Sequence, residues 1–269
     1  MKLAALQMTS GPDVEANLAC AAQLLGEAAG EGARLAVLPE NFAFMGLADA
    51  DKRRIAEADG AGPIQDFLTR SARELHLWIV AGTVPLRLPQ EPRVAAACLV
   101  FTDGGERVAR YDKVHLFDVS VPGASGENYR ESANIAPGKD VIIVDTVVGR
   151  LGLSVCYDLR FPELYRRLSA EGAQILSVPS AFTVPTGRAH WETLLRARAI
   201  ENLCHLVAPA QSGFHASGRE TYGDSMIVDH WGRVLQRRPR GSGCVIAELD
   251  LEAQAKARAS FPSLEHRVL

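Results

Sequence analysis

Short apolar runs alternate with helical patterns along most of this chain. Continuous runs of this kind are typical of strands that are buried on both faces of a sheet. They lie at 2–7, 34–39, 77–84, 95–101, 141–146, 150–156, 174–180, 205–210, 225–229 and 244–250. Helices are predicted between several of them, over 13–29, 62–75, 162–171 and 187–202. Asp13 can cap the first helix, and Pro63 and Pro162 suit a first helical turn. Strands that alternate with helices predict α/β architecture.

The bulk composition favours a single globular domain over residues 1–269 without nucleic-acid or membrane partners. No internal repeat, low-complexity tract or composition break divides the chain. The net charge of −3 gives no electrostatic reason to bind nucleic acid or an anionic membrane. The first eleven residues, "MKLAALQMTSG", lack the long apolar region of a secretory signal or a spanning helix. We therefore expect a cytoplasmic protein.

The cysteines are odd in number and scattered, which predicts reduced thiols and not a disulfide framework. Neither a CxxC nor an HExxH pattern occurs, so we expect no metal site. The five cysteines are Cys20, Cys98, Cys156, Cys204 and Cys244.

Two segments interrupt the alternation of strands and helices. Residues 117–140 and 211–224 are polar and punctuated by glycine, and the first also contains proline. Connections this long are uncommon inside compact domains and often carry function. Both segments are therefore candidate walls of a pocket.

Cys156 lies at the exit of an apolar run, between "RLGLSV" and "YDLRFPEL". At the end of a strand a nucleophile is lifted clear of the sheet, and the following backbone N–H groups are free to face an oxyanion. The alternative is an ordinary buried cysteine, which is the better interpretation of the other four.

Glu40 and Lys113 also lie at or beside apolar runs. Alone, Glu40 marks an exit into solvent and Lys113 is a snorkelling or sheet-edge charge. Together with Cys156 they supply a carboxylate base, a cation and a thiol, the parts of an acyl-transfer site. A Cys–His hydrolase is the chemical alternative, and the available histidines are His115, His190 and His230.

Three blocks, "LPENF", "YDKVHLFD" and "GLSVCYDLRFPELYR", resemble the signature blocks of the nitrilase superfamily of carbon–nitrogen hydrolases. The resemblance covers essentially the whole chain. It implies an αββα sandwich of two helix-covered sheets that forms a homodimer or higher homo-oligomer through helices, such as those near 162–171 and 187–202. Within the superfamily, "KVHLFDVSVPG", "SAFTVPTG" and "HWETLLRARAIEN" resemble Nit-type amidases, most closely the branch that hydrolyses deaminated glutathione.

The resemblance also implies roles for individual residues. Glu40, Lys113 and Cys156 match the catalytic glutamate, lysine and cysteine, without a cofactor or a metal. Glu131 matches a second, supporting glutamate, for which Glu127 is a rival. The remaining implied residues are Tyr157, whose backbone N–H would face the oxyanion, and Phe182 and Thr183, which would form the substrate wall.

Several alternatives remain open at the level of sequence. Glu40, Lys113 and Cys156 together predict acyl-transfer chemistry but do not select the acyl group. They are therefore compatible with ω-amidase activity on α-ketoglutaramate, with nitrile hydrolysis and with N-carbamoyl hydrolysis. A non-enzymatic interaction protein on the same fold is the alternative of another class. The candidate cations for a substrate carboxylate are Arg160, Arg188 and Arg198. Next to the nucleophile, we expect Asp158 and Arg160 to form an ion pair and Glu163 to lie in a first helical turn.

Overall fold

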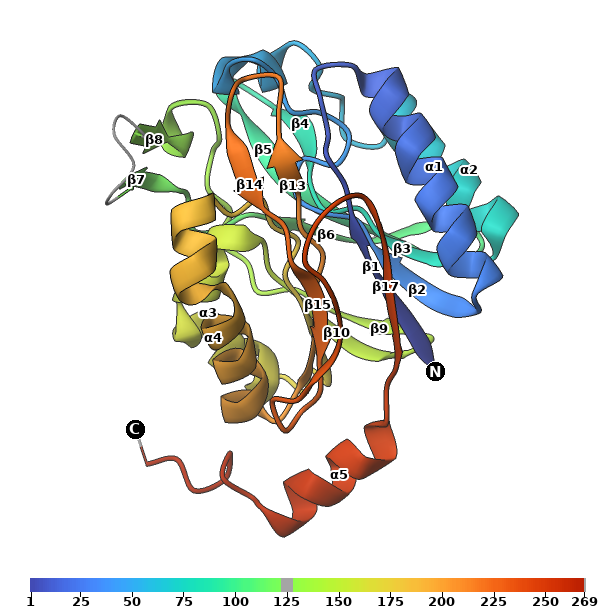
Figure 1. Cartoon of the computed structure of the whole chain (residues 1–269), viewed down its shortest axis with the longest axis vertical. Coiled ribbons are helices and arrows are strands. Elements are labelled where there is room, and N and C mark those ends of the chain that lie inside the picture. Colours follow the sequence, from blue (N-terminus) through green and yellow to red (C-terminus); the bar gives the residue numbers. More distant parts are fainter. Residues whose placement is uncertain (122–127, 269) are drawn as a thin grey trace.

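Two β-sheets pack face to face between two pairs of helices in the computed structural model (Figure 1). The structure describes residues 1–121 and 128–268. Helices α1 (Val14–Gly30) and α2 (Pro63–Leu75) cover one sheet, and α3 (Pro162–Ala170) and α4 (Val184–Asn202) cover the other. A fifth helix, α5 (Leu251–Ser260), lies near the C-terminal end. The predicted αββα sandwich is confirmed.

The first sheet contains seven strands, three of which run parallel. Its members are β1 (Lys2–Gln7), β2 (Ala33–Val37), β3 (Trp78–Val80), β4 (Val84–Leu88), β5 (Glu91–Phe101), β6 (Arg107–Asp112) and β17 (Gly243–Glu248). Their order is β17-β1-β2-β3-β5-β4, and β6 pairs with β5. The parallel strands β1, β2 and β3 are joined through α1 and α2. Such crossovers place both helices on one face of the sheet.

The second sheet contains six strands around a parallel centre. Its members are β9 (Ile143–Thr146), β10 (Gly149–Leu153), β11 (Ile175–Ser177), β12 (His205–Ala208), β15 (Ser225–Val228) and β16 (Val234–Arg238). The order is β16-β15-β12-β11-β10-β9, with β10, β11 and β12 parallel. Helices α3 and α4 connect these three parallel strands.

The alternation of side chains within β1 shows why the strand sequences are continuously apolar. Leu3 and Ala5 belong to the core between the two sheets, whereas Ala4 and Leu6 belong to the core beneath α1 and α2. Successive side chains of a strand point to opposite faces, so a strand buried on both faces has no polar side. All four are fully buried.

The helix signals identified in the sequence are confirmed. Asp13 Oδ1 accepts a hydrogen bond from the Ala16 amide at the start of α1, and Pro63 and Pro162 lie in the first turns of their helices. Strands β6 and β16 and helix α5 were not predicted. Both strands carry several charged residues, and their apolar content is too low to form a run.

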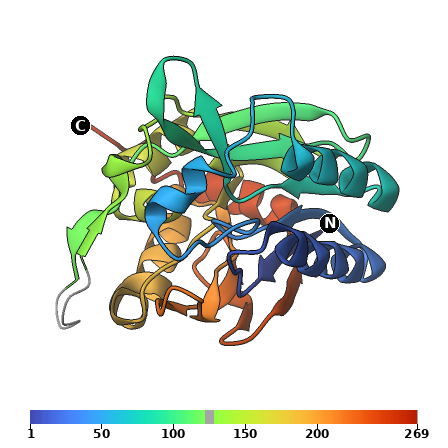
Figure 2. The same cartoon turned by 90° about the horizontal axis from the view of Figure 1, so that it is seen from above.

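The two segments expected as loops each contain a short antiparallel ladder. Strands β7 (Asp118–Ser120) and β8 (Asn128–Arg130) pair within 117–140, and β13 (Ser212–Phe214) and β14 (Glu220–Tyr222) pair within 211–224. The β7–β8 ladder projects from the body of the molecule (Figure 2).

Three short 3₁₀ helices follow strands and bring polar residues to one edge of the sandwich. They are η1 (Asp49–Arg53), η2 (Glu131–Ala133) and η3 (Cys156–Arg160). In α/β sheets, ligands bind outside the carboxyl ends of the parallel strands. The ends of β2 and β10 lead directly to Glu40 and Cys156, so this edge is the place to look for a site.

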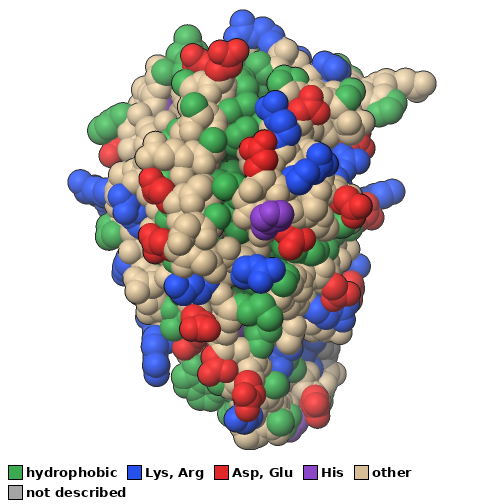
Figure 3. Space-filling view, turned by 90° about the vertical axis from the view of Figure 1, so that its right-hand side faces the viewer, with side chains coloured by type: hydrophobic (Ala, Val, Ile, Leu, Met, Phe, Trp, Pro, Cys, Tyr) green, Lys and Arg blue, Asp and Glu red, His purple; other side chains and the backbone are tan. Residues whose placement is uncertain are grey.

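The face of the molecule over α1 and α2 shows interspersed acidic and basic side chains (Figure 3). Mixed charges of this kind are typical of a solvated surface. Within 1–121 and 128–268, no helix has the length and apolar content needed to cross a membrane.

Candidate active site

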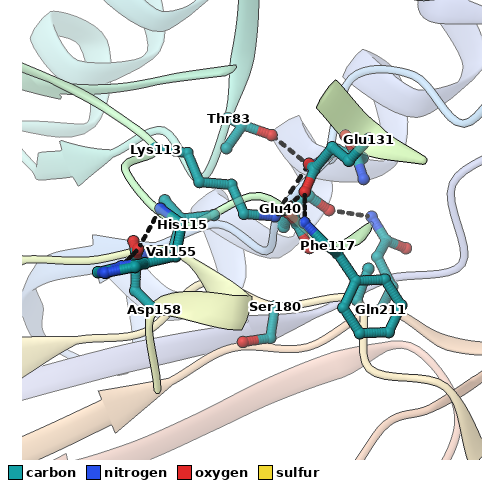
Figure 4. Close-up of polar contacts among 12 residues, drawn as sticks. Glu40, Thr83, Lys113, His115, Phe117, Glu131, Val155, Asp158, Ser180 and Gln211 are labelled. Atoms are coloured by element: carbon teal, nitrogen blue, oxygen red, sulfur yellow. Dashed lines mark hydrogen bonds and ion pairs between the residues drawn. The ribbon is translucent and has the colours of Figure 1, made fainter. Parts of the chain in front are cut away.

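Glu40, Lys113 and Glu131 meet in a buried ionic cluster although they come from three separate segments (Figure 4). Lys113 Nζ lies 2.8 Å from Glu40 Oε1 and 2.9 Å from each carboxylate oxygen of Glu131. Only 1% of Lys113 and 5% of Glu40 is exposed. A buried ammonium is tolerated when it is paired and hydrogen-bonded, and the two carboxylates meet both requirements.

Cys156 begins η3 with a left-handed backbone, at a φ of 48°. Such a conformation costs a non-glycine residue about 1–3 kcal/mol and persists only where neighbouring contacts impose it. Here the Cys156 amide donates to the carbonyl oxygen of Pro179 at 2.9 Å. Cys156 is buried but lines a cavity.

Two hydrogen bonds and one close backbone approach fix the backbone around Glu40. Gln211 Nε2 donates to the Glu40 carbonyl oxygen at 3.1 Å, and the next amide, of Asn41, donates to Thr83 Oγ1 at 2.8 Å. Gly82 adopts a φ of 53°, and a Cβ atom there would lie 2.0 Å from the carbonyl oxygen of Pro39. Only glycine permits this close approach, which sets the path of the chain before Glu40.

The segment 117–140 wraps around Lys113 and delivers Glu131. Gly138 donates to the Lys113 carbonyl oxygen at 2.9 Å, and a Cβ atom at Gly138 would lie 2.1 Å from the carbonyl oxygen of Asp112. Glu131 Oε2 also accepts from the Phe117 amide at 2.6 Å. Glu131 thus bonds directly to Lys113, and its rival Glu127 lies outside the described residues.

The predicted ion pair between Asp158 and Arg160 is wrong. Asp158 is fully buried and instead accepts hydrogen bonds from Tyr111 Oη at 2.6 Å, the Val155 amide at 2.8 Å and the His115 amide at 2.9 Å. Its carboxylate thus joins the Lys113 segment to the Cys156 turn, a role that spacing along the chain could not indicate. Glu163, as predicted, lies in the first turn of α3.

The ionisation of the cluster follows from burial and from its charges. Burial opposes charge on Lys113, but the charges of Glu131 and Glu40 raise its pKa well above the usual value. Burial would raise the pKa of Glu40, yet the charge and hydrogen bond of Lys113 lower it overall. Burial and the Glu40 charge raise the pKa of the Cys156 thiol despite the opposing effect of Lys113. The site therefore rests with a neutral thiol beside an ionised carboxylate.

All the site residues inferred from sequence line one cavity of about 590 Å³. They are Glu40, Lys113, Glu131, Cys156, Tyr157, Phe182 and Thr183. Both segments predicted as pocket walls contribute to it, through Phe117 and Tyr129 from the first and Arg219 from the second. Within the described parts of the chain, the lining contains no histidine, which argues against the Cys–His alternative.

The family model of carbon–nitrogen hydrolases matches residues 2–259. This chain belongs to the carbon–nitrogen hydrolase family. A curated protein of Synechocystis named deaminated glutathione amidase is 45% identical over 268 residues, which cover 98% of this chain and 97% of the relative.

Solved structures place the fold in the same family. The NitFhit protein of C. elegans has a TM-score of 0.92 at 40% identity, covering 99% of this chain and 65% of that one. An amidase from Nesterenkonia sp. AN1 has a TM-score of 0.80 at 27% identity, covering 97% of this chain and 98% of that one. Its structure is described as showing Michael addition of acrylamide at the active-site cysteine.

In this carbon–nitrogen hydrolase, only one of the three predicted substrate-binding arginines reaches the cavity. Arg160 lines it, whereas Arg188 lines a separate surface groove. Arg198 is buried and is bonded to the Leu159 carbonyl oxygen at 3.0 Å and to Glu201 at 2.9 Å, so it is structural. The predictions for Arg188 and Arg198 are therefore wrong for this cavity.

Sequence reasoning missed two further cations of the cavity lining, Lys52 and Arg219. Arg219 is the one arginine in the predicted wall segment 211–224, which was a usable signal. Lys52 lies in "DADKR", where nothing in the sequence distinguishes it from a solvated charge. Among the residues described in the structure, no group of three or more His, Cys, Asp or Glu side chains could hold a metal ion.

Proposed function

We propose that this carbon–nitrogen hydrolase is an amidase that hydrolyses deaminated glutathione through a thioester on Cys156. One observation carries the proposal: the Cys156 thiol shares a buried cavity with the Glu40–Lys113–Glu131 cluster. The relatives named deaminated glutathione amidase support the choice of substrate. The products would be a 2-oxo dicarboxylic acid and cysteinylglycine.

In the first half-reaction, Glu40 accepts the thiol proton while the sulfur of Cys156 bonds to the amide carbon. The carbonyl electrons move to oxygen, and Lys113 Nζ and the Tyr157 backbone N–H stabilise the resulting oxyanion. The carbonyl then re-forms and the C–N bond breaks. Glu40 returns its proton to the departing nitrogen, which leaves as the amine and leaves a thioester on the enzyme.

In the second half-reaction, a water molecule takes the place of the amine. Glu40 accepts a proton from the water as its oxygen attacks the thioester carbon. When the C–S bond breaks, the sulfur takes the proton held by Glu40 and the acid is released. One water molecule is consumed, and both the thiol and the carboxylate return to their starting states.

The raised pKa of the Cys156 thiol gives Glu40 a necessary role. The cluster of Glu40, Glu131 and Lys113 already carries a net charge of −1, so a permanent thiolate on Cys156 would add a second negative charge. Proton transfer from sulfur is therefore best coupled to attack, with the lowered pKa of Glu40 keeping the base ionised. Glu131 holds Lys113 in place through two hydrogen bonds.

Phe182 and Thr183, which line the same cavity as Cys156 and Lys113, form the proposed substrate wall. Phe182 packs against Trp191 with ring centroids 4.8 Å apart, and Thr183 Oγ1 lies 2.8 Å from Thr186 Oγ1. These contacts pre-organise both side chains, so the wall is already formed before a ligand binds.

A cytoplasmic homo-oligomer is the proposed state of the enzyme. All five cysteines are free, which is typical of proteins in a reducing compartment. Ile200 on α4 and the neighbouring Trp231 are large apolar side chains with 47% and 58% exposure. Contacts through α3 and α4 would cover such a surface, and solution mass tests the prediction.

The experiment that tests the function is turnover of a small amide panel by the wild type and by Cys156→Ala. The panel contains deaminated glutathione, α-ketoglutaramate, glutamine, an aliphatic nitrile and an N-carbamoyl amino acid. Cys156-dependent release of the 2-oxo acid from deaminated glutathione, above the other substrates, is expected. Cys20→Ala, a change at a cysteine on α1, serves as the control that retains activity. Preferred turnover of another compound would overturn the substrate, and absence of turnover would favour a non-enzymatic protein.

A further inference from the structure

Three cations line the cavity without a role in the acyl chemistry, namely Lys52, Arg160 and Arg219. In the described parts of the chain, no carboxylate lies within ion-pair distance of any of them. The lining also contains the acidic side chains of Glu40, Glu131 and the exposed Asp49. With Lys113 alone the lining would be net negative and would repel a carboxylated ligand. The three additional cations make it net positive.

Arg160 and Arg219 lie on the side of the cavity formed by the Cys156 turn and the segment that follows β11. Arg219 donates to the carbonyl oxygen of Ala181, and its guanidinium lies 5.0 Å from the ring centroid of Tyr129. The guanidinium of Arg160 lies 5.5 Å from the ring centroid of Phe182. Both arginines therefore border the wall proposed for the acyl group.

Arg219 also has a buried donor that the described structure leaves unused. Its Nε is inaccessible to solvent and finds no hydrogen-bond partner among the residues described. Leaving a buried donor unsatisfied costs about 1–3 kcal/mol, so such atoms call for an explanation. A guanidinium presents its donors in a planar fork that matches a carboxylate. Because Arg219 lines the cavity, its guanidinium can offer this fork to a ligand carboxylate.

Lys52 lies next to the base. It is close enough for its charge to lower the pKa of Glu40. Together with Asn41 and Ile135, it lines both the main cavity and an adjoining cavity of about 270 Å³. The adjoining cavity offers room for a group that extends past Glu40 and away from the two arginines.

We infer that this site is built for amides that carry a carboxylate on each side of the scissile bond, with the acyl carboxylate on Arg160 and Arg219 and the carboxylate of the leaving amine on Lys52. The assignment rests on the proposed amidase function, because Glu40 must lie next to the nitrogen that it protonates. The amine portion therefore extends towards Lys52. Deaminated glutathione carries both carboxylates, whereas a short ω-amide carries only the first.

The test compares deaminated glutathione with the same compound capped as a carboxamide at its glycine end. We expect Lys52→Met to lower the ratio of kcat/KM for the free acid to kcat/KM for the capped compound about tenfold, which corresponds to about 1.4 kcal/mol. Arg219→Gln is the matched control. It should lower kcat/KM for both compounds and leave their ratio unchanged, because both retain the acyl carboxylate.

A binding experiment separates this inference from the proposed function. Calorimetry with Cys156→Ala gives the Kd of each compound without turnover, and adding Lys52→Met or Lys52→Gln should weaken only the free acid. If the wild type fails to hydrolyse deaminated glutathione while this pattern persists, the proposed function is wrong and the inference stands. Equal effects of the Lys52 changes on both compounds, or no binding of the free acid, would overturn the inference.

Discussion

Tyr111 Oη donates a 2.6 Å hydrogen bond to Asp158 Oδ2, and this bond joins the strand before Lys113 to the turn that carries Cys156. Burial, together with the charge of Asp158, raises the pKa of the Tyr111 phenol, so the hydroxyl remains a donor at any working pH. Asp158 also accepts from the His115 amide at 2.9 Å, just beyond Lys113. Figure 4 shows Asp158 beside His115 and Val155, so one buried carboxylate links the segment after Lys113 to the residue before Cys156.

Replacing Tyr111 by Phe tests this positioning role. The change should lower the free energy of unfolding by about 1–2 kcal/mol through loss of a buried hydrogen bond. It should also lower kcat about tenfold, because small displacements of reacting groups are costly. Tyr165→Phe is the matched control, since it removes a buried hydroxyl that lies 2.8 Å from Ser154 Oγ. Urea unfolding and steady-state kinetics check both, and a similar loss of kcat in both would contradict the role.

Lys113→Met should lower kcat by at least about 10²-fold, because a preorganised oxyanion donor is lost. It should also destabilise the fold by about 3–5 kcal/mol, since the buried Glu40 and the partly buried Glu131 lose their partner. The double variant Lys113→Met with Glu131→Gln removes one of those charges and should recover part of the stability. It should not recover kcat. Recovery of both would make Lys113 a structural residue only.

The apolar runs predicted the α/β class, whereas the two-sheet layering and the proposed catalytic groups came from the resemblance to carbon–nitrogen hydrolases. The core strands are buried on both faces, so their apolar runs are visible without any tertiary information. Glu40, Lys113 and Cys156 were located because each falls in a recognisable block at the end of such a run. The extent of the single domain over 1–269 stays a prediction.

Contacts between distant segments explain what the sequence did not predict. Asp158 is two residues from Arg160 but bonds to Tyr111, 47 positions away, because η3 turns its carboxylate into the core. Burial and the Glu40 charge raise the pKa of the Cys156 thiol more than the Lys113 charge lowers it. This balance depends on distances between atoms that no linear pattern contains. Lys52 likewise lines the cavity because of the tertiary fold, which the residues around it in the sequence do not reveal.

The pH profile distinguishes the Glu40 base from a histidine base. Because the folded pKa of Glu40 is lowered, the base stays ionised down to acidic pH, and kcat/KM should be flat from about pH 8 to about pH 5. The ionised Glu40 carboxylate contributes its full stabilisation of the fold above its pKa in the unfolded state. This contribution is lost only as the pH falls through its lower pKa in the folded state. Kinetics at each pH, with melting temperature as the control for folding, test this. A fall in kcat/KM with a midpoint at about pH 6.5 would indicate a histidine base instead.

Glu40→Gln should abolish turnover and at the same time lower the pKa of the Cys156 thiol. The wild-type pKa is raised by burial and then by the Glu40 charge, whereas Lys113 acts in the opposite direction. Without the carboxylate charge, only burial raises the pKa of the thiol, and Lys113 still lowers it. The thiolate therefore becomes easier to form. The pH dependence of iodoacetamide modification, followed at each cysteine by peptide mass spectrometry, measures the shift. Cys20 on α1 should be unaffected and serves as the internal control. A midpoint for Cys156 that stays in place or rises would separate Glu40 from the thiol and remove it as the base.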